Sequence, residues 1–200
     1  MTKVQKFERD NLSPHLSKDG LAIFERYVLN SNCYLEYGSG GSTLRAHNLG
    51  AKHIISVDSS KDWTQAIKKS LNGSTNVDLL YCNIGTIGNW GKPVNDDGIK
   101  NYHNYMVTPW KVAHNKNLDV DLIMIDGRFR VACFLYSLLC AKPGAIILFD
   151  DYTLRPRYHV VEEFCPKIKS YGRLAEFVVN KNYNLPELVA RISEYSIVKD

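Results

Sequence analysis

The sequence predicts an α/β fold in which helices cover both faces of a mostly parallel β-sheet. Short apolar runs of strand length alternate along the chain with segments whose apolar residues recur at helical spacing. A glycine-rich turn, Gly38–Ser42, follows the first of these runs, and aspartates directly follow several others. Because parallel strands bind ligands at their carboxyl ends, this order places polar residues at a functional edge of the sheet.

The first half of the chain alternates three helices with three strands. Each helix has apolar side chains three or four residues apart; the helices are Asp19–Leu29, Thr43–Leu49 and Asp62–Leu71. Gly50 follows the second helix directly, and glycine commonly ends a helix in this way. Each strand is a short run rich in Ile, Val, Leu and Tyr; the strands are Cys33–Tyr37, His53–Val57 and Val77–Tyr81.

The alternation resumes after residue 117. The strands expected there are again short and apolar: Leu122–Ile125, Ala145–Phe149 and Leu174–Val179. The helix Arg130–Ala141 has one apolar face and stops at Lys142-Pro143-Gly144, because proline and glycine interrupt helices. Two more helices are predicted, one from Arg157 or Tyr158 to Cys165 and an amphipathic one at Pro186–Tyr195.

The segment Gly85–Asn117 interrupts this pattern with four glycines, two prolines and little periodicity. We therefore expect a single domain over residues 1–200 with an inserted loop at about 85–117, since long insertions often serve as lids or binding loops. Its aromatic residues either wall a pocket or only anchor the loop; they are Trp90, Tyr102, Tyr105 and Trp110.

Composition excludes several classes of protein. The 200 residues are 44% hydrophobic and carry a net charge of +4, which is low for a dedicated nucleic-acid binder. No apolar run reaches the length of a membrane-spanning helix, and Met1–Asp10 lacks the apolar core of a secretory signal. Five cysteines without paired spacing indicate reduced, mostly buried thiols. We expect a cytoplasmic protein that binds neither nucleic acid nor membrane.

Three features at the predicted strand ends suit a nucleotide-like ligand. Glycines at positions 38 and 40 allow a tight turn and a close approach of the backbone to a ligand. Asp58 lies twenty residues after Gly38, the spacing at which an acid reaches ribose hydroxyls. Asp126 and the pair Asp150-Asp151 end two further strands. The third glycine of the dinucleotide pattern is replaced by Thr43, which weighs against an NAD(P) site.

These residues resemble the class I S-adenosylmethionine-dependent methyltransferases, and the turn Leu139–Ala145 adds to the likeness. The resemblance covers roughly residues 32–151 and implies a Rossmann-like three-layer sandwich. It places the methionine part of the cofactor at Glu36 and the glycine loop, the ribose at Asp58, the adenine at Asn83, and the substrate at Asp126. The implied cofactor-binding residues are Glu36, Gly38, Ser39, Gly40, Ser42, Asp58, Asn83 and Asp126.

Ile125-Asp126-Gly127 and Phe149–Tyr152 are similar to segments of metal-dependent small-molecule O-methyltransferases. That likeness implies that Asp126, Asp150 and Asp151 bind Mg²⁺, which would lower the pKa of a substrate hydroxyl. The alternative is that the aspartate pair only caps the following loop. The chain departs from the pattern at Arg128 and Arg130, whose charges would oppose a metal or attract an acidic substrate.

A basic cluster follows the same strand ends; it comprises Arg128, Arg130, Arg155, Arg157 and His159. Arginines near a site commonly bind carboxylate or phosphate, while the alternative is a solvated helix start that pairs with Glu162 and Glu163. His159 is a candidate general base or an ordinary surface histidine. We expect Asp126 or Asp151, with His159 as a further candidate, to position or deprotonate the acceptor.

The resemblance implies an S-adenosylmethionine-dependent methyltransferase that acts on a small molecule at oxygen. Two alternatives keep the fold: an NAD(P)-dependent oxidoreductase, and a non-catalytic methyltransferase-like binding protein. The oxidoreductase is disfavoured because the third glycine of the dinucleotide pattern is missing. The binding protein is disfavoured because the cofactor residues Glu36, Gly38, Gly40 and Asp58 are all present. A nucleic-acid methyltransferase would need a base-handling Asn/Asp-Pro-Pro-Tyr motif, which is absent from the sequence.

Overall fold

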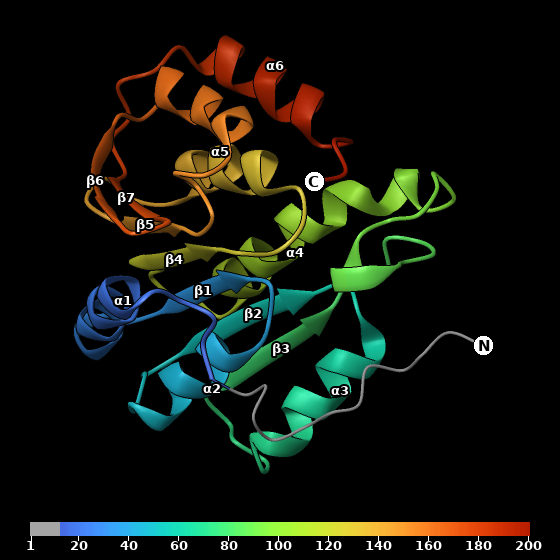
Figure 1. Cartoon of the computed structure of the whole chain (residues 1–200), viewed down its shortest axis with the longest axis vertical. Helices are drawn as coiled ribbons and strands as arrows, with labels where there is room; N and C mark the ends of the chain where they lie inside the picture. Colours follow the sequence, from blue (N-terminus) through green and yellow to red (C-terminus); the bar gives the residue numbers. More distant parts are fainter. Residues whose placement is uncertain (1–12) are drawn as a thin grey trace.

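The computed structural model describes residues 13–200, so the expectation for Met1–Asp10 lies outside the described residues. Seven strands form one sheet in the order β3-β2-β1-β4-β5-β7-β6 (Figure 1). Strand β7 is antiparallel to both of its neighbours, and the other neighbouring pairs are parallel. The strands are β1 Tyr34–Tyr37, β2 Ile54–Asp58, β3 Val77–Tyr81, β4 Leu122–Ile125, β5 Ile146–Phe149, β6 Lys167–Tyr171 and β7 Leu174–Val178.

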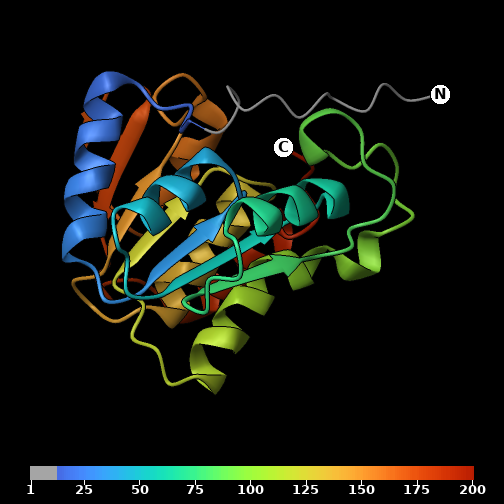
Figure 2. The ribbon, with the colours of Figure 1, turned by 90° about the horizontal axis from the view of Figure 1, so that it is seen from below.

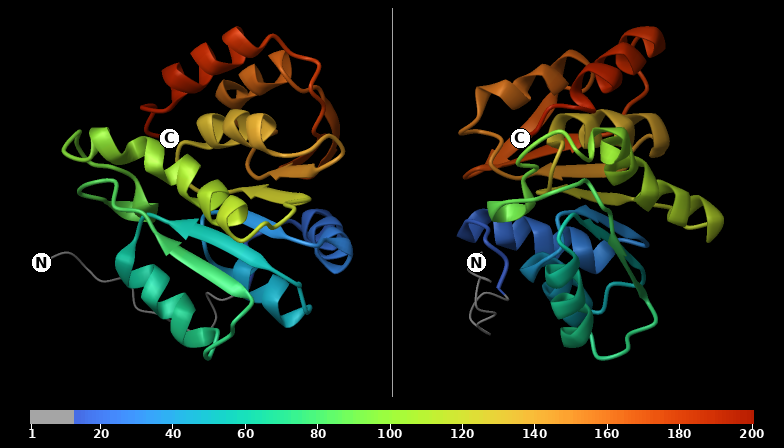
Figure 3. Two further views of the ribbon diagram at one scale, coloured as in Figure 1. Left: turned by 180° about the vertical axis from the view of Figure 1, so that it is seen from behind. Right: turned by 90° about the vertical axis from the view of Figure 1, so that its right-hand side faces the viewer.

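Helices cover both faces of the sheet, which confirms the predicted three-layer arrangement (Figures 2 and 3). The helices are α1 Lys18–Asn30, α2 Gly41–Asn48, α3 Lys61–Ser70, α4 Tyr102–Asn115, α5 Arg130–Cys140 and α6 Leu185–Tyr195. Helices α1, α2 and α3 lie on one face, while α4 and α5 lie on the other with α6 packed against α5. No helix in residues 13–200 is long and apolar enough to cross a bilayer.

The side chains of β1 alternate between the two faces of the sheet, so this strand packs against both helical layers. Leu35 and Tyr37 point into the core beneath α4 and α5, whereas Tyr34 belongs to the core beneath α1 and α2. Successive side chains of a strand point to opposite faces, so Glu36 lies on the same face as Tyr34. A charged residue therefore enters the layer that contains the start of α2.

Helix α4 corrects the expectation of a loop throughout 85–117. The second half of that segment is helical and buries Tyr102, Tyr105 and Trp110 against the sheet. Its Trp110 Nε1 donates to the Tyr37 hydroxyl at 2.9 Å, which ties the helix to β1. Pro109 inside the helix disguised its periodicity. Only Trp90 of the four aromatic residues is exposed, so the other three anchor a helix instead of walling a pocket.

The remaining differences are local. Strand β6 was not predicted, because its sequence Lys-Ile-Lys-Ser-Tyr is mostly polar, as suits an exposed edge strand. The segment after β5 forms a 3₁₀ helix, Pro156–Glu163, in place of the expected α-helix. Cys140 is exposed and the other four cysteines are buried, which agrees with the prediction that most of the thiols are buried.

Candidate active site

Four strand ends stand side by side at one edge of the sheet. The N–H of Gly38 bonds the Val57 carbonyl at 2.9 Å, and the N–H of Asp126 bonds the Tyr37 carbonyl at 2.9 Å. Beyond β4, the N–H of Asp150 bonds the Ile125 carbonyl at 3.0 Å. The residues that follow β2, β1, β4 and β5 therefore form one row. Strands β1 to β3 are added in one direction across the sheet, and β4 and β5 are added on the other side of β1. The row therefore crosses the topological switch point, where such sheets bind ligands.

Gly38 is required by the contact between the loops after β1 and β4. Its φ of +99° lies in the region that favours glycine, and a Cβ there would lie 2.8 Å from the Gly127 nitrogen. The neighbouring Gly40 is different, because a Cβ there would meet nothing closer than Trp63 at 3.8 Å. Packing within the described residues therefore explains Gly38 and leaves Gly40 without a structural reason to be glycine.

Glu36 is held in a cage of hydroxyl groups. Its carboxylate accepts hydrogen bonds from the hydroxyls of Tyr34 at 2.9 Å and Ser56 at 2.8 Å, and from those of Ser42 and Thr43 at the start of α2. Burial raises the pKa of Glu36 above its usual range, while these hydrogen bonds lower it. The carboxylate faces into the protein, so its contribution is to join β1, β2 and α2 and shape the glycine loop.

The two serines of the glycine loop also direct their hydroxyls inward. Ser39 Oγ lies 2.8 Å from Ser56 Oγ, within hydrogen-bond distance, and the Ser39 carbonyl accepts from Trp63 Nε1 at 2.6 Å. Ser42 is one of the donors to Glu36. Any contact that Ser39 or Ser42 makes with a ligand therefore comes from the main chain. The sequence pattern could not reveal this, because the inward donors and acceptors come from distant elements.

Asp58 ends β2 beside the glycine loop. One of its carboxylate oxygens accepts from the Ser60 N–H at 2.7 Å, in a local turn before α3. Burial raises the pKa of Asp58 to about 6, against the lowering effects of the Ser60 N–H and the charge of Arg128. Asn83 lies just past β3, is exposed, and accepts the Gly85 N–H at 3.0 Å.

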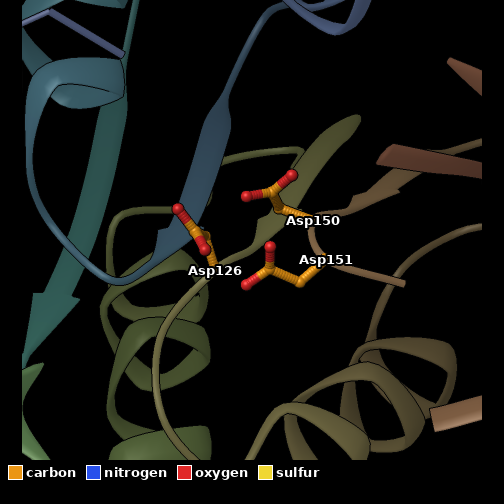
Figure 4. A group of neighbouring side chains, drawn as sticks. All are labelled: Asp126, Asp150 and Asp151. Carbon is orange, nitrogen blue, oxygen red and sulfur yellow. The ribbon is translucent and has the colours of Figure 1, made fainter. Parts of the chain in front are cut away.

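Asp126, Asp150 and Asp151 come together as the sequence predicts, and their side chains lie next to one another (Figure 4). One carboxylate oxygen from each lies within 4.8 Å of the others. Burial and the charges of the other two aspartates raise the pKa of Asp126 to about 7, against the lowering effect of Arg130. Asp151 has a φ of +58°, an uncommon conformation for aspartate that turns the chain sharply after β5.

Three arginines surround this acid triad of Asp126, Asp150 and Asp151. Arg130 pairs with Asp126 at 2.9 Å, and Arg155 pairs with Asp151 at 2.7 Å. Arg173, which sequence reasoning missed, bonds both oxygens of Asp150 at 2.9 and 2.8 Å. Arg173 lies in the β6–β7 turn, beyond the segment that resembles the methyltransferases, so no motif pointed to it.

The rest of the predicted basic cluster serves other contacts. His159 Nε2 lies 3.2 Å from the Tyr152 carbonyl, and its ring packs against the Tyr152 ring. Arg157 lies over the ring of Tyr158, 5.0 Å from its centroid. Arg128 donates to the main-chain oxygen of Asp200, whose side chain accepts the Arg130 N–H at 3.1 Å. Of the three predicted catalytic residues, the structure therefore brings Asp126 and Asp151 together, while His159 contacts Tyr152 instead.

No protein-family model matches the sequence, and no curated protein sequence matches it. The solved structure of a methyltransferase-like protein from Silicibacter pomeroyi is 31% identical, with a TM-score of 0.82 over 93% of this chain and 98% of that one. The chain belongs to the methyltransferase-like proteins. This membership confirms the Rossmann-like class I fold that the sequence resemblance implies.

More distant structures share only the fold of this methyltransferase-like chain. A protein from Escherichia coli described as a methyltransferase is 14% identical, with a TM-score of 0.52 over 83% of this chain and 86% of that one. A 16S rRNA methyltransferase from Thermus thermophilus, solved with AdoMet and guanosine, is also 14% identical. Its TM-score is 0.51 over 84% of this chain and 44% of that one.

The acid triad of this methyltransferase-like chain does not fit a divalent cation. Three carboxylates are the ligand type that Mg²⁺ prefers, but an ion also needs their oxygens free to point at it. Arg173 occupies both oxygens of Asp150, and Arg130 and Arg155 pair with the other two aspartates. The arginine charges balance those of the aspartates, so a cation has no excess negative charge to neutralise.

Proposed function

We propose that this chain is an S-adenosylmethionine-dependent methyltransferase that acts on a small molecule at oxygen. The observation that carries the proposal is the alignment of Asp58, Gly38 and Asp126 in one row at the switch point of the sheet. The row offers an acid for a ribose, the backbone of the glycine loop for the methionine end, and a carboxylate beside the reacting group. Membership of the methyltransferase-like family supports the methyl-transfer part of this proposal.

Each part of the cofactor is assigned to residues of this row or beside it. The main chain of Gly38–Ser42 would bind the methionine end, where Gly40 leaves room for close approach. Asp58 would accept hydrogen bonds from the ribose hydroxyls, and exposed Asn83 would contact the adenine. Glu36 would not contact the cofactor; it would hold the glycine loop in its conformation through its hydrogen bonds to Ser42 and Thr43. S-adenosylmethionine supplies a methyl group activated by its sulfonium charge, so the protein mainly has to align the acceptor.

Asp126 is the candidate general base. Its pKa of about 7 is close to the value at which a carboxylate both stays ionised and accepts a proton effectively. Arg130 holds one of its oxygens at 2.9 Å, which fixes the direction of the carboxylate. Asp126 would take the proton that the acceptor hydroxyl loses as it is methylated. Asp151 would position Arg130 and Arg155, while His159 is less suited because its Nε2 faces a carbonyl.

An acidic acceptor is favoured by Arg157. Its side chain is exposed, and within residues 13–200 its guanidinium contacts the hydroxyl and ring of Tyr158 and pairs with no carboxylate. An unpaired guanidinium beside the site can bind a carboxylate or phosphate of a substrate. We therefore include an anionic group in the proposed acceptor.

Calorimetric titration with S-adenosylhomocysteine tests the proposal, with NAD⁺ titrated as the control ligand. Micromolar binding of the homocysteine compound, weakened at least tenfold by Asp58→Ala, is the expected result. Binding of NAD⁺ instead would move the assignment to hydride transfer. Binding of neither ligand by folded protein would favour a non-catalytic binding protein and overturn the proposal.

A further inference from the structure

Six charged residues form one network of ion pairs: Asp126, Asp150, Asp151, Arg130, Arg155 and Arg173. Asp150 is 1% exposed and pairs with Arg173. Asp151 forms three ion pairs, with Arg155 at 2.7 Å, Arg130 at 3.3 Å and Arg173 at 3.4 Å. Arg130 also pairs with Asp126 at 2.9 Å. Each aspartate is thus bound by at least one guanidinium, and Asp151 by three.

The network joins parts of the chain that are far apart. Its aspartates follow β4 and β5, while its arginines come from the start of α5, the segment before Pro156 and the turn before β7. Arg130 is also anchored by the carbonyls of Gly127 and Asp150, at 3.0 and 2.9 Å. A third carbonyl, that of Asp126, accepts from it at 3.1 Å. With the carboxylates of Asp126 and Asp151, these carbonyls give the Arg130 guanidinium five contacts, which leave it little freedom to withdraw from the aspartates.

A divalent cation between these aspartates would have to replace the guanidinium groups as their partner. Guanidinium is a planar, permanently charged donor that bonds both oxygens of a carboxylate, as Arg173 does with Asp150. Arg155 and Arg173 are 35% and 34% exposed, so both can be removed without opening a core cavity. They are therefore the two residues whose loss would free the aspartates for a cation.

We propose that Arg155 and Arg173 stand in the place of a divalent cation and act as positioning residues for the acid triad. In this arrangement Arg173 neutralises Asp150, and Arg155 and Arg173 together neutralise Asp151 and hold its carboxylate in place. The unaltered protein binds no Mg²⁺ or Mn²⁺ at the triad, and removal of both arginines uncovers a cation site there. This inference does not depend on the proposed reaction, because its readout is metal binding.

Manganese binding tests the proposal, measured by electron paramagnetic resonance of free Mn²⁺ and by calorimetry. For the unaltered protein we expect no site tighter than millimolar. For the double variant Arg155→Ala/Arg173→Ala we expect an Mn²⁺ affinity at least tenfold higher, abolished by a further Asp150→Asn change. Arg155→Ala alone serves as a second variant should the double variant fail to fold.

Arg191→Ala provides the matched control, since Arg191 is 33% exposed and also pairs with two carboxylates, Glu163 and Glu194, both at 2.9 Å. It should leave Mn²⁺ binding unchanged. Sub-millimolar binding by the unaltered protein that Asp150→Asn removes would overturn the proposal. So would folded arginine variants that gain no affinity. Failure of S-adenosylhomocysteine binding would count against the proposed function and leave this inference standing.

Discussion

Arg173 binds Asp150 with two nitrogens, Nε 2.9 Å from Oδ1 and Nη2 2.8 Å from Oδ2. The carboxylate is 1% exposed, and Arg173 is 34% exposed at the edge of the network. The same guanidinium donates to the His15 carbonyl, so it also connects the strand ends to the segment that precedes α1. A single side chain thus neutralises a buried charge and links three parts of the fold.

Loss of that partner should be costly. Arg173→Ala leaves Asp150 buried without its paired charge, and we expect a loss of roughly 2 to 3 kcal/mol in the free energy of unfolding. Urea denaturation measures this change. Arg191→Ala, at an exposed site with two ion pairs, should cost less than about 1 kcal/mol. Equal losses in the two variants would contradict the importance of burial at Asp150.

Gly38 and Gly40 should respond differently to the same substitution. Gly38→Ala forces a Cβ against the backbone of Gly127 at positive φ, which we expect to cost at least about 2 kcal/mol. Gly40→Ala meets nothing closer than 3.8 Å and should keep the stability within about 1 kcal/mol. If Gly40 faces the cofactor, its alanine variant should still bind S-adenosylhomocysteine more weakly. Denaturation and calorimetry on both variants give the answer.

The hydroxyl cage makes Glu36 a structural carboxylate. Glu36→Ala removes the acceptor shared by four hydroxyl groups, so we expect a loss of about 3 kcal/mol in stability. Glu36→Gln keeps one acceptor oxygen and the side-chain volume, and should cost about 1 kcal/mol. Thermal and urea unfolding of the two variants compare them. A Gln variant as unstable as the Ala variant would show that the charge matters more than the hydrogen bonds.

The raised pKa of Asp58 should make cofactor binding depend on pH. Its pKa is about 6, so the ionised form that accepts ribose hydroxyl bonds increases as the pH rises from 5 to 7. At pH 5 roughly one site in ten is ionised, so S-adenosylhomocysteine affinity should fall about tenfold relative to pH 8. Titrations across this range measure it. Asp58→Asn should flatten the profile, and a profile unchanged by that variant would assign the dependence to another group.

The raised pKa of Asp58 should make folding stability fall as the pH rises, whereas cofactor affinity increases. The folded protein holds the Asp58 proton more tightly than the unfolded chain, whose aspartate has a pKa of about 4. Stability contributed by protonated Asp58 is therefore present at low pH and is lost as the pH rises from about 4 to about 6. Asp58→Asn should remove this part of the pH dependence, as urea titrations at several pH values would detect.

The sequence by itself determined the layered α/β fold and the order of polar residues along the strand ends. Strands β3 and β4 begin and end at the predicted residues, because short apolar runs bounded by polar residues are unambiguous. Asp126, Asp150 and Asp151 could be placed together since parallel strands bring their carboxyl ends to one edge. These are consequences of local periodicity and chain direction, which a single sequence contains.

Only the tertiary structure decided which partners those residues have. Helix α4 was concealed by Pro109, and polar β6 exists because β7 offers it an edge with which to pair. Arg173 reaches Asp150 from 23 residues along the chain, and its guanidinium changes an expected metal site into a charge-balanced network. Hydrogen bonds and ion pairs between distant segments depend on packing in three dimensions, and no local pattern in the sequence records them.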